Sequence, residues 1–244
     1  MTNQTVTSAT PHVVADLPPD TTPAAVTLER VTKVFNDAAG VPPVLQDLSL
    51  RVGAGEFVCL LGASGCGKST LLNLVAGLDS PTTGQIEVPG GKTALMFQES
   101  ALFPWLTAGK NIELALRLSG VPRTEWKAEI ARLLDLVHLS GQENKRIHEL
   151  SGGMRQRVAL ARALAQRARI LLMDEPFAAL DAITRDVLHE ELHRIWREAD
   201  LTVIFVRQWQ IDIEGPRRIE SPAVSALSAE ITEDLRREIR RHGR

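Results

Sequence analysis

The stretch Gly62-Ala-Ser-Gly-Cys-Gly-Lys-Ser-Thr70 decides how this chain folds. It matches the pattern GxxxxGK[ST] and follows a continuous apolar run, "EFVCLLG", that is typical of a fully buried strand. A helix is expected next, over residues 69–76. In this context the glycines let backbone N–H groups point at phosphate oxygens, and the helix adds its positive N-terminal end. The expected phosphate-binding residues are Gly62, Ser64, Gly65, Cys66, Gly67, Lys68, Ser69 and Thr70.

Two acidic residues end a second buried strand, in "ARILLMDE". Lys68 is expected to pair with the β- and γ-phosphates of a bound nucleotide, and Ser69 and Asp174 are expected to hold Mg²⁺ from two sides. Glu175 is next to Asp174 and could polarise an attacking water as general base. Two neighbouring acids can also form an ordinary solvated turn. The phosphate site favours the catalytic interpretation because it supplies a charged ligand for them.

The rest of the chain alternates strands and helices. Residues 1–25 are poor in large apolar side chains and are expected to be a disordered tail. "VTLERVTKVF" and "VLQDLSLRV" alternate apolar and polar residues as half-buried antiparallel strands do, and "PTTGQIEVPGGKTALMF" carries two short strands. Residues 106–150 have apolar side chains at helical spacing, which indicates a helical insertion. Helices over 152–166 and 182–199 then alternate with the strands "ARILLMD" and "LTVIFV", which predicts a three-layer α/β core with a mainly parallel sheet.

Composition limits the class of protein. A chain of 244 residues with 44% hydrophobic content can bury a full core, and a net charge of −2 gives no electrostatic reason to expect nucleic-acid binding. Two cysteines, Cys59 and Cys66, are too few for a disulfide framework and fit a reducing compartment. No apolar run is long enough to cross a bilayer and the N-terminus lacks a secretory signal. Any membrane role is therefore expected to come through a partner.

The segment Leu150-Ser-Gly-Gly-Met-Arg-Gln-Arg157 lies shortly before the acidic strand, and with it the chain resembles the ATP-binding subunits of ABC transporters. The resemblance implies an α/β fold: a P-loop NTPase (RecA-like) three-layer core with an antiparallel β subdomain and an inserted helical subdomain. It divides the chain into the tail (1–25), the first part of the ATP-binding core (26–98), the helical subdomain (99–150), the second part of the core (151–206) and a C-terminal segment (207–244).

The signature segment also implies a partner. Ser151 and the N–H groups of Gly152 and Gly153 open a helix and can bind an anion. In the family this anion is the γ-phosphate of an ATP held by the other protomer. The resemblance therefore implies a homodimer with two nucleotides between its subunits.

Three further residues match family positions. Phe35 matches the aromatic residue that stacks on adenine, although a core phenylalanine on a strand is nearly as good an interpretation. Gln98, in "LMFQE", matches the glutamine that contacts Mg²⁺ and the attacking water and that links the core to the helical subdomain. Asp181 ends the Ala179-Leu-Asp181 loop, which in the family reports across the dimer interface.

The stretches "MFQESALFPWLTAGKNIELAL" and "DEPFAALDAITRDVLHEEL" resemble the nitrate, sulfonate and taurine importer branch, and are closest to aliphatic sulfonate import ATP-binding proteins. This implies a peripheral subunit at the cytoplasmic face of the cell membrane, with integral membrane permease subunits as partners and an extracytoplasmic solute-binding protein as an indirect one. The apolar residues 102–106 suit contact with a permease helix. Phe103 and Trp105 could equally pack inside the helical subdomain.

His189-Glu-Glu-Leu-His193 satisfies HExxH, a zinc-binding pattern. The other histidines offer no supporting third ligand, and Leu188 and Leu192 are expected to face the core. His189, Glu190 and His193 are therefore expected on or beside the solvated side of the helix, without zinc.

The chain departs from the family after "LTVIFV". There the family has a histidine that reaches the γ-phosphate, followed by a helix and another strand, whereas this chain has Arg207 and Gln208. Val206 to Arg207 is therefore interpreted as a junction, and loss of a strand is expected to leave an unpaired sheet edge. An alternative function follows: a clamp that dimerises on ATP but hydrolyses it poorly. Leu227, Ile231, Leu235 and Ile239 predict an amphipathic helix near the C-terminus.

Overall fold

The computed structural model describes residues 12–14, 22–35, 42–62, 65–177, 180–199 and 201–208. Ser64, Ala179 and the amphipathic helix expected near the C-terminus lie outside these ranges. The strands are β1 His12–Val14, β2 Ala24–Lys33, β3 Leu45–Gly53, β4 Phe57–Gly62, β5 Thr83–Glu87, β6 Thr93–Met96, β7 Ile170–Asp174 and β8 Thr202–Gln208. The helices are α1 Lys68–Val75, α2 Ala108–Leu118, α3 Trp126–Leu136, the short 3₁₀ helix η1 Ile147–Glu149, α4 Gly152–Leu164 and α5 Ala182–Ala199.

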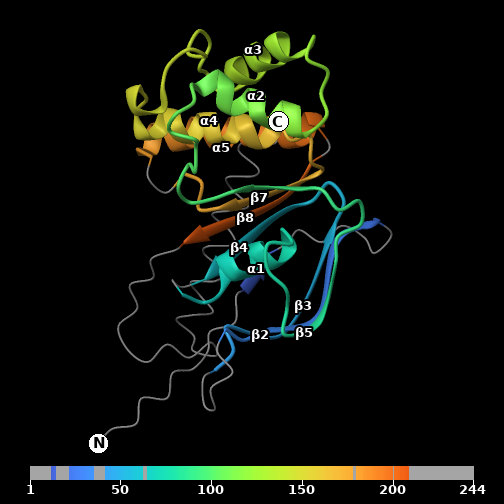
Figure 1. Cartoon of the computed structure of the whole chain (residues 1–244). Helices are drawn as coiled ribbons and strands as arrows, with labels where there is room; N and C mark the ends of the chain where they lie inside the picture. The colour runs from blue at the N-terminus through green and yellow to red at the C-terminus, as the bar shows by residue number, and fades with distance from the viewer. Residues whose placement is uncertain are drawn as a thin grey trace, which may run out of the picture.

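Two sheets organise the described residues. The first has the order β1-β4-β8-β7-β6, with parallel pairing between β4 and β8, β8 and β7, and β7 and β6. The second is antiparallel, in the order β3-β2-β5. Figure 1 shows α2 to α5 above the first sheet, and α1 below it beside the antiparallel strands. The predicted three-layer α/β core, antiparallel subdomain and helical insertion are confirmed.

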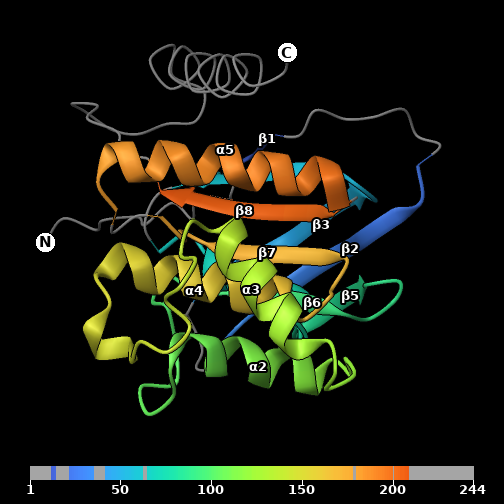
Figure 2. The same ribbon diagram turned by 90° about the horizontal axis from the view of Figure 1, so that it is seen from above.

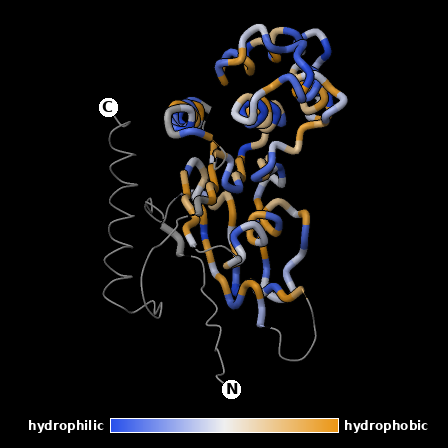
Figure 3. Tube along the Cα trace, turned by 90° about the vertical axis from the view of Figure 1, so that its left-hand side faces the viewer, coloured by the Kyte–Doolittle hydropathy of each residue, from blue (hydrophilic) through white to orange (hydrophobic). Residues whose placement is uncertain are grey.

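The first sheet separates two hydrophobic cores because successive side chains of a strand point to opposite faces. On β4, Cys59 and Leu61 pack with the helices α2 to α5, whereas Val58 and Leu60 pack with α1 and the antiparallel sheet. Seen from above, α5 runs alongside β8 and α4 lies beside β7 (Figure 2). The hydropathy colouring shows hydrophobic residues along the strands, between the layers (Figure 3). Full burial of a leucine such as Leu60 contributes about 1.5–3 kcal/mol.

Strand β1 differs from the expectation of a disordered tail over residues 1–25. His12, Val13 and Val14 pair antiparallel with Leu61, Leu60 and Cys59 of β4, and β2 already begins at Ala24. The signal in the sequence is short: two β-branched valines between Pro11 and Pro18. The low content of large apolar side chains over residues 1–25 as a whole predicts disorder in spite of these two valines.

The end of β8 also bears on the expected junction. The strand continues without interruption through Arg207 and Gln208, which pair with Leu61 and Gly62 of β4. The other edge of β4 is covered by β1 from Cys59 to Leu61. From Cys59 to Leu61, β4 therefore pairs with β8 on one side and with β1 on the other. This differs from the expectation that loss of a strand leaves an unpaired edge.

The described helices include none with the length and apolar character needed to span a bilayer.

Candidate nucleotide-binding site

The loop between β4 and α1 requires glycine at position 67. Gly67 precedes the first turn of α1 with φ 97°, in the left-handed region. A Cβ atom there would lie 2.8 Å from Leu45 Cδ2 and 2.9 Å from the Val44 carbonyl oxygen. Glycine therefore lets the loop turn tightly against β3 and aim the first N–H groups of α1 into the mouth of the loop.

Lys68 is held across this mouth. Its side chain is buried, and its Nζ donates a hydrogen bond of 2.8 Å to the Gly62 carbonyl and lies 3.6 Å from Cys66 Sγ. A Cβ atom on Gly62 would lie 2.6 Å from the same sulfur, so the loop is closely packed around the lysine. The ammonium group is thus fixed beside the loop's N–H groups, as binding of a phosphate requires.

The hydroxyl residues of this motif lie in the first turn of α1. Ser69 is exposed and Thr70 is half-buried. Gly65, with φ 79°, is also exposed. Ser69 is therefore accessible to a ligand in the loop, as a residue that binds Mg²⁺ must be.

The acidic pair lies at the carboxyl end of β7. Asp174 is the last residue of the strand, and the Glu175 N–H donates to the Val206 carbonyl of β8 at 3.1 Å. Glu175 has φ 45°, which a non-glycine residue adopts only when its surroundings enforce it. Burial raises the pKa of the Glu175 carboxyl, Asp174 raises it further, and Lys68 opposes both. Because β4 and β7 both pair in parallel with β8, Lys68 and the acidic pair follow strand ends at the same edge of the sheet, and the raised pKa makes Glu175 a better proton acceptor.

Gln98 follows β6 at the same edge of the sheet. Its side chain is exposed, and its backbone carbonyl accepts a hydrogen bond of 2.7 Å from Gln156 Nε2 on α4. Asp181 is also exposed, and its Oδ1 accepts from the Thr184 N–H at 2.9 Å, so it caps α5. Sequence patterns did not single out Gln156, because its role depends on a contact with a residue distant in the chain.

The signature residues open α4. Ser151 caps the helix, with its Oγ accepting from the Met154 N–H at 3.2 Å, and both Ser151 and Gly152 are exposed. A Cβ atom on Gly153 would lie 3.1 Å from Leu180 Cδ2, so glycine lets the helix approach the loop after β7. Helix α4 packs on the opposite face of the sheet from α1.

Phe35 is 63% exposed, so the interpretation of a core phenylalanine is wrong. Lys33 Nζ lies 5.0 Å from the centre of its ring and donates to Asp79 at 2.7 Å. The ring is therefore accessible for stacking, which remains a prediction.

The HExxH residues have a structural explanation. The His193 ring stacks on Phe57 with centroids 4.8 Å apart, and the His189 ring lies 5.3 Å from Phe177. The two histidines are half-buried between α5 and the sheet rather than on its solvated side, which corrects that expectation, whereas Glu190 is exposed. Within the described ranges no group of three or more histidine, cysteine or acidic residues could hold a metal ion.

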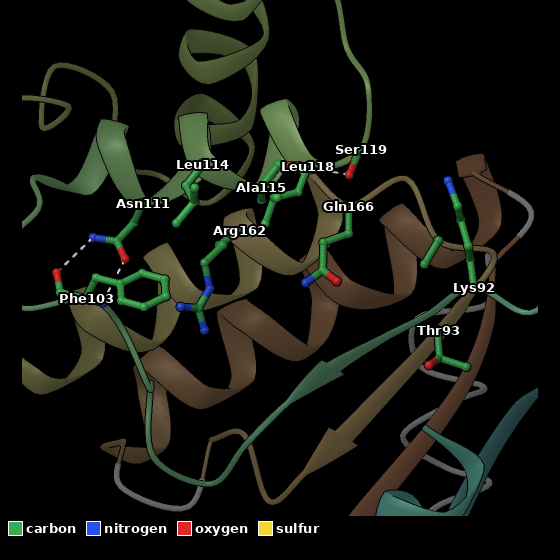
Figure 4. A pocket seen from close by; sticks show the side chains of 11 residues that line it. Lys92, Thr93, Phe103, Asn111, Leu114, Ala115, Leu118, Ser119, Arg162 and Gln166 are labelled. Carbon is green, nitrogen blue, oxygen red and sulfur yellow. Dashed lines mark hydrogen bonds between the residues drawn. The ribbon is translucent and has the colours of Figure 1, made fainter. Parts of the chain in front are cut away.

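A groove of about 380 Å³ lies between α2, α4 and the start of β6. Figure 4 shows its lining, which combines apolar side chains with two cations: Lys92, Thr93, Phe103, Asn111, Leu114, Ala115, Leu118, Ser119, Arg162, Gln166 and Ala168. Phe103 is 36% exposed and Trp105 is 68% exposed, while Leu102 is buried. Trp105 therefore does not pack inside the helical subdomain.

Comparisons with known proteins agree with this geometry. Residues 45–178 match the ABC transporter family model. The chain is 46% identical over 194 residues to the bicarbonate transport ATP-binding protein CmpD of Synechocystis sp., covering 76% of this chain and 69% of CmpD. It is 45% identical to the taurine import ATP-binding protein TauB of Burkholderia pseudomallei, covering 75% and 73%, and 45% identical to the nitrate import ATP-binding protein NrtD of Synechococcus elongatus, covering 72% and 68%.

Solved structures give the same result. The dimeric post-hydrolysis structure of the ATP-binding cassette MJ0796 bound to ADP and Pi has a TM-score of 0.67 and 33% identity to this chain, covering 74% of this chain and 87% of MJ0796. The fold is that of a P-loop NTPase. Because identity is near 45% over about three quarters of the sequence, this chain belongs to the ATP-binding subunits of ABC transporters.

Proposed function

We propose that this chain hydrolyses ATP to drive import of a small anion, with aliphatic sulfonates as the first substrate class and nitrate or taurine as alternatives. The observation that carries the ATPase assignment is that Lys68, which follows β4, and the acidic pair Asp174 and Glu175, which ends β7, lie at the same edge of the sheet, because β4 and β7 both pair in parallel with β8. The named substrates of the relatives are taurine, nitrate and bicarbonate. Taurine is itself a sulfonate, which favours the sulfonate class.

The residues present suit ATP with Mg²⁺. Ser69, Gln98 and Asp174 offer a hydroxyl, an amide oxygen and a carboxylate, the oxygen ligands that Mg²⁺ prefers. When bound, Mg²⁺ neutralises charge on the β- and γ-phosphates. Lys68 binds the same phosphates, and Phe35 offers an exposed ring to the adenine. Glu175 accepts a proton from the water that attacks the γ-phosphate.

We propose a homodimer as the active form. Helices α1 and α4 pack on opposite faces of the sheet, which supports supply of Ser151, Gly152 and Gly153 by a second copy. Their N–H groups would stabilise charge on the γ-phosphate held by the partner. The MJ0796 cassette, which is dimeric, supports the same arrangement.

The groove beside α2 is the proposed contact with integral membrane permease subunits. It combines apolar residues, such as Phe103 and Leu118, with the cations Lys92 and Arg162, which suits an amphipathic helix carrying acidic residues. With such a partner, the chain would lie at the cytoplasmic face of the cell membrane. A solute-binding protein outside the membrane would supply the solute indirectly, and the net charge of −2 argues against nucleic acid as a partner.

Absence of the family histidine after β8 favours one alternative, an ATP-dependent clamp with impaired hydrolysis. The two functions are separated by measuring ATP binding and turnover independently in the purified chain. Binding accompanied by turnover well above that of Glu175→Gln supports the ATPase. Tight binding with turnover equal to that of the variant supports the clamp.

The solute is tested in cells that express this chain with its permease and binding protein. Uptake of a labelled alkanesulfonate is compared with uptake of taurine, nitrate and bicarbonate. The sulfonate proposal predicts preferential uptake of the alkanesulfonate, and uptake of nitrate or bicarbonate alone would exclude it. Lys68→Ala serves as the transport-negative control.

A further inference from the structure

Helix α4 holds the segment that carries Gln98. Gln156 Nε2 donates a hydrogen bond of 2.7 Å to the Gln98 carbonyl. Six residues further along the helix, Arg162 donates through NH1 to the Ala101 carbonyl at 2.7 Å and through NH2 to the Ser100 carbonyl at 3.2 Å. The segment 98–101 lies between β6 and α2, outside any helix or strand. These side chains therefore fix a backbone that has no sheet or helix pairing of its own.

The anchored segment has an enforced conformation. Ala101 has φ 43°, in the left-handed region that alanine rarely adopts. Arg162 lies against Phe103, with its guanidinium carbon 6.0 Å from the ring centre, and burial lowers the pKa of Arg162. A desolvated guanidinium that binds carbonyl oxygens gives strong, directional contacts. These contacts explain how the unfavourable geometry at Ala101 persists.

Gln156 is difficult to explain by packing alone. Its side chain is 5% exposed, and its Oε1 atom has no hydrogen-bond partner among the described residues. Burial of an amide oxygen without a partner destabilises a fold, so an apolar residue would fill this position at lower cost. Among the described residues, the hydrogen bond to the Gln98 carbonyl is the polar contact that this side chain makes.

Gln98 depends on its backbone for its position. Its side chain is exposed and makes no hydrogen bond within the described part of the chain. We propose that Gln156 and Arg162 are positioning residues, which hold residues 98–101 so that the Gln98 side chain meets Mg²⁺ and the attacking water. This inference rests on the proposed ATPase function, and it assigns Gln156 and Arg162 a role through Gln98 rather than contact with ATP.

The test compares Gln156→Leu and Arg162→Met with wild type and with Gln142→Leu. Gln142 is the control because its Oε1 is, like that of Gln156, buried without a hydrogen-bond partner among the described residues, although the residue as a whole is half-buried; it makes no hydrogen bond to residues 98–101. The first measurement is hydrogen exchange in the nucleotide-free protein. The amide of Phe103, which donates to Asn111 Oδ1 at the end of this segment, is expected to exchange about tenfold faster or more in Gln156→Leu and Arg162→Met, and at the wild-type rate in Gln142→Leu.

The second measurement is the Mg²⁺ dependence of ATP binding and turnover. Loss of a residue that orients a metal ligand typically lowers metal affinity or activity about 10- to 100-fold. The Mg²⁺ concentration for half-maximal effect is therefore expected to rise, and kcat to fall, while affinity for ATP without Mg²⁺ stays within about twofold of wild type. Arg162→Lys keeps one cationic donor and is expected to recover part of the loss, whereas Gln156→Glu replaces the donor with an acceptor and is expected to behave like Gln156→Leu.

The outcomes separate this inference from the proposed function. If hydrogen exchange in Gln156→Leu and Arg162→Met is faster but the Mg²⁺ dependence is unchanged, the positioning role is wrong. It is also wrong if hydrogen exchange is unchanged. Equal effects in Gln142→Leu also overturn it. If the wild type binds ATP without turnover, the proposed ATPase function is wrong. A shift in the Mg²⁺ dependence of ATP binding in the variants would still support the positioning role. If Gln156→Leu does not fold, Gln156→Glu and the two Arg162 variants give the same comparison.

Discussion

At the scale of single residues, Glu175 combines an unusual backbone with an unusual acidity. Its φ of 45° is enforced where β7 ends, and its N–H is tied to Val206 of the neighbouring strand. Burial and the adjacent Asp174 raise the pKa of its carboxyl. Strain and a shifted pKa at one position are typical of a catalytic group.

Replacement of Glu175 by Gln tests this role. The variant keeps the shape of the side chain but cannot accept a proton, so turnover is expected to fall about 10²-fold or more while ATP still binds. Turnover and nucleotide affinity are measured separately, with Glu87→Gln on the exposed strand β5 as a control. Turnover close to that of wild type would remove Glu175 as the base.

The pH dependence provides a second test of Glu175. A raised pKa means that the carboxyl keeps its proton to a higher pH than an ordinary glutamate, for which the reference value is 4.5. The base is then lost earlier as pH falls, so the acid limb of kcat/KM, which reports the free protein, is expected above that value. The limb is measured at constant ionic strength, and it should be absent from the residual activity of Glu175→Gln. An acid limb at or below the reference value contradicts the assignment.

At the scale of elements, periodicity predicted most of the fold. Helix α5 buries Leu188, Leu192 and Ile195 on one face, as their spacing predicts, and the strands β4 and β7 are the two apolar runs beside the motifs. The P-loop residues could be predicted because they are contiguous in the sequence. Strand β1 could not, because three residues carry little periodic signal and the pairing with β4 is long-range. The contacts of Gln156 and Arg162 with residues 98–101 could not be predicted from periodicity either, because they are also long-range.

Strand β1 gives a prediction about backbone pairing. N–H groups along an antiparallel strand alternate in direction, so in a regular pair one of Val13 and Val14 donates to β4 and the other points away. Val13→Pro and Val14→Pro are therefore expected to differ. The variant that removes the donor should lower Tm by about 2–4 °C, as loss of one hydrogen bond worth about 1 kcal/mol would in a domain of this size.

Val6→Pro serves as the control because it introduces the same residue on the N-terminal side of β1. The three variants are compared with wild type by thermal unfolding at one protein concentration. If all three have the wild-type Tm, the pairing of β1 with β4 does not contribute to stability in solution.

At the scale of the whole molecule, the two motif-bearing helices pack on opposite faces of the sheet. Helix α1, which carries Lys68, packs in the core on one face, and α4, which Ser151 caps, packs in the core on the other. The sequence predicts both motifs, and we propose that a second copy completes each site. Two copies arranged head to tail would join each P-loop to the partner's signature.

This arrangement predicts complementation between two inactive variants. Lys68→Ala removes the phosphate contact of one half-site, and Ser151→Arg blocks the signature of the other, so each homodimer has two defective sites. A mixed dimer joins the intact P-loop of one variant to the intact signature of the other, and it therefore has one complete site. Because a random mixture contains half mixed dimers, turnover is expected to recover to about a quarter of the wild-type value when the sites act independently. Turnover is measured for each variant alone and for the mixture at equal total concentration, and a mixture no more active than its components would mean that the site is complete within one chain.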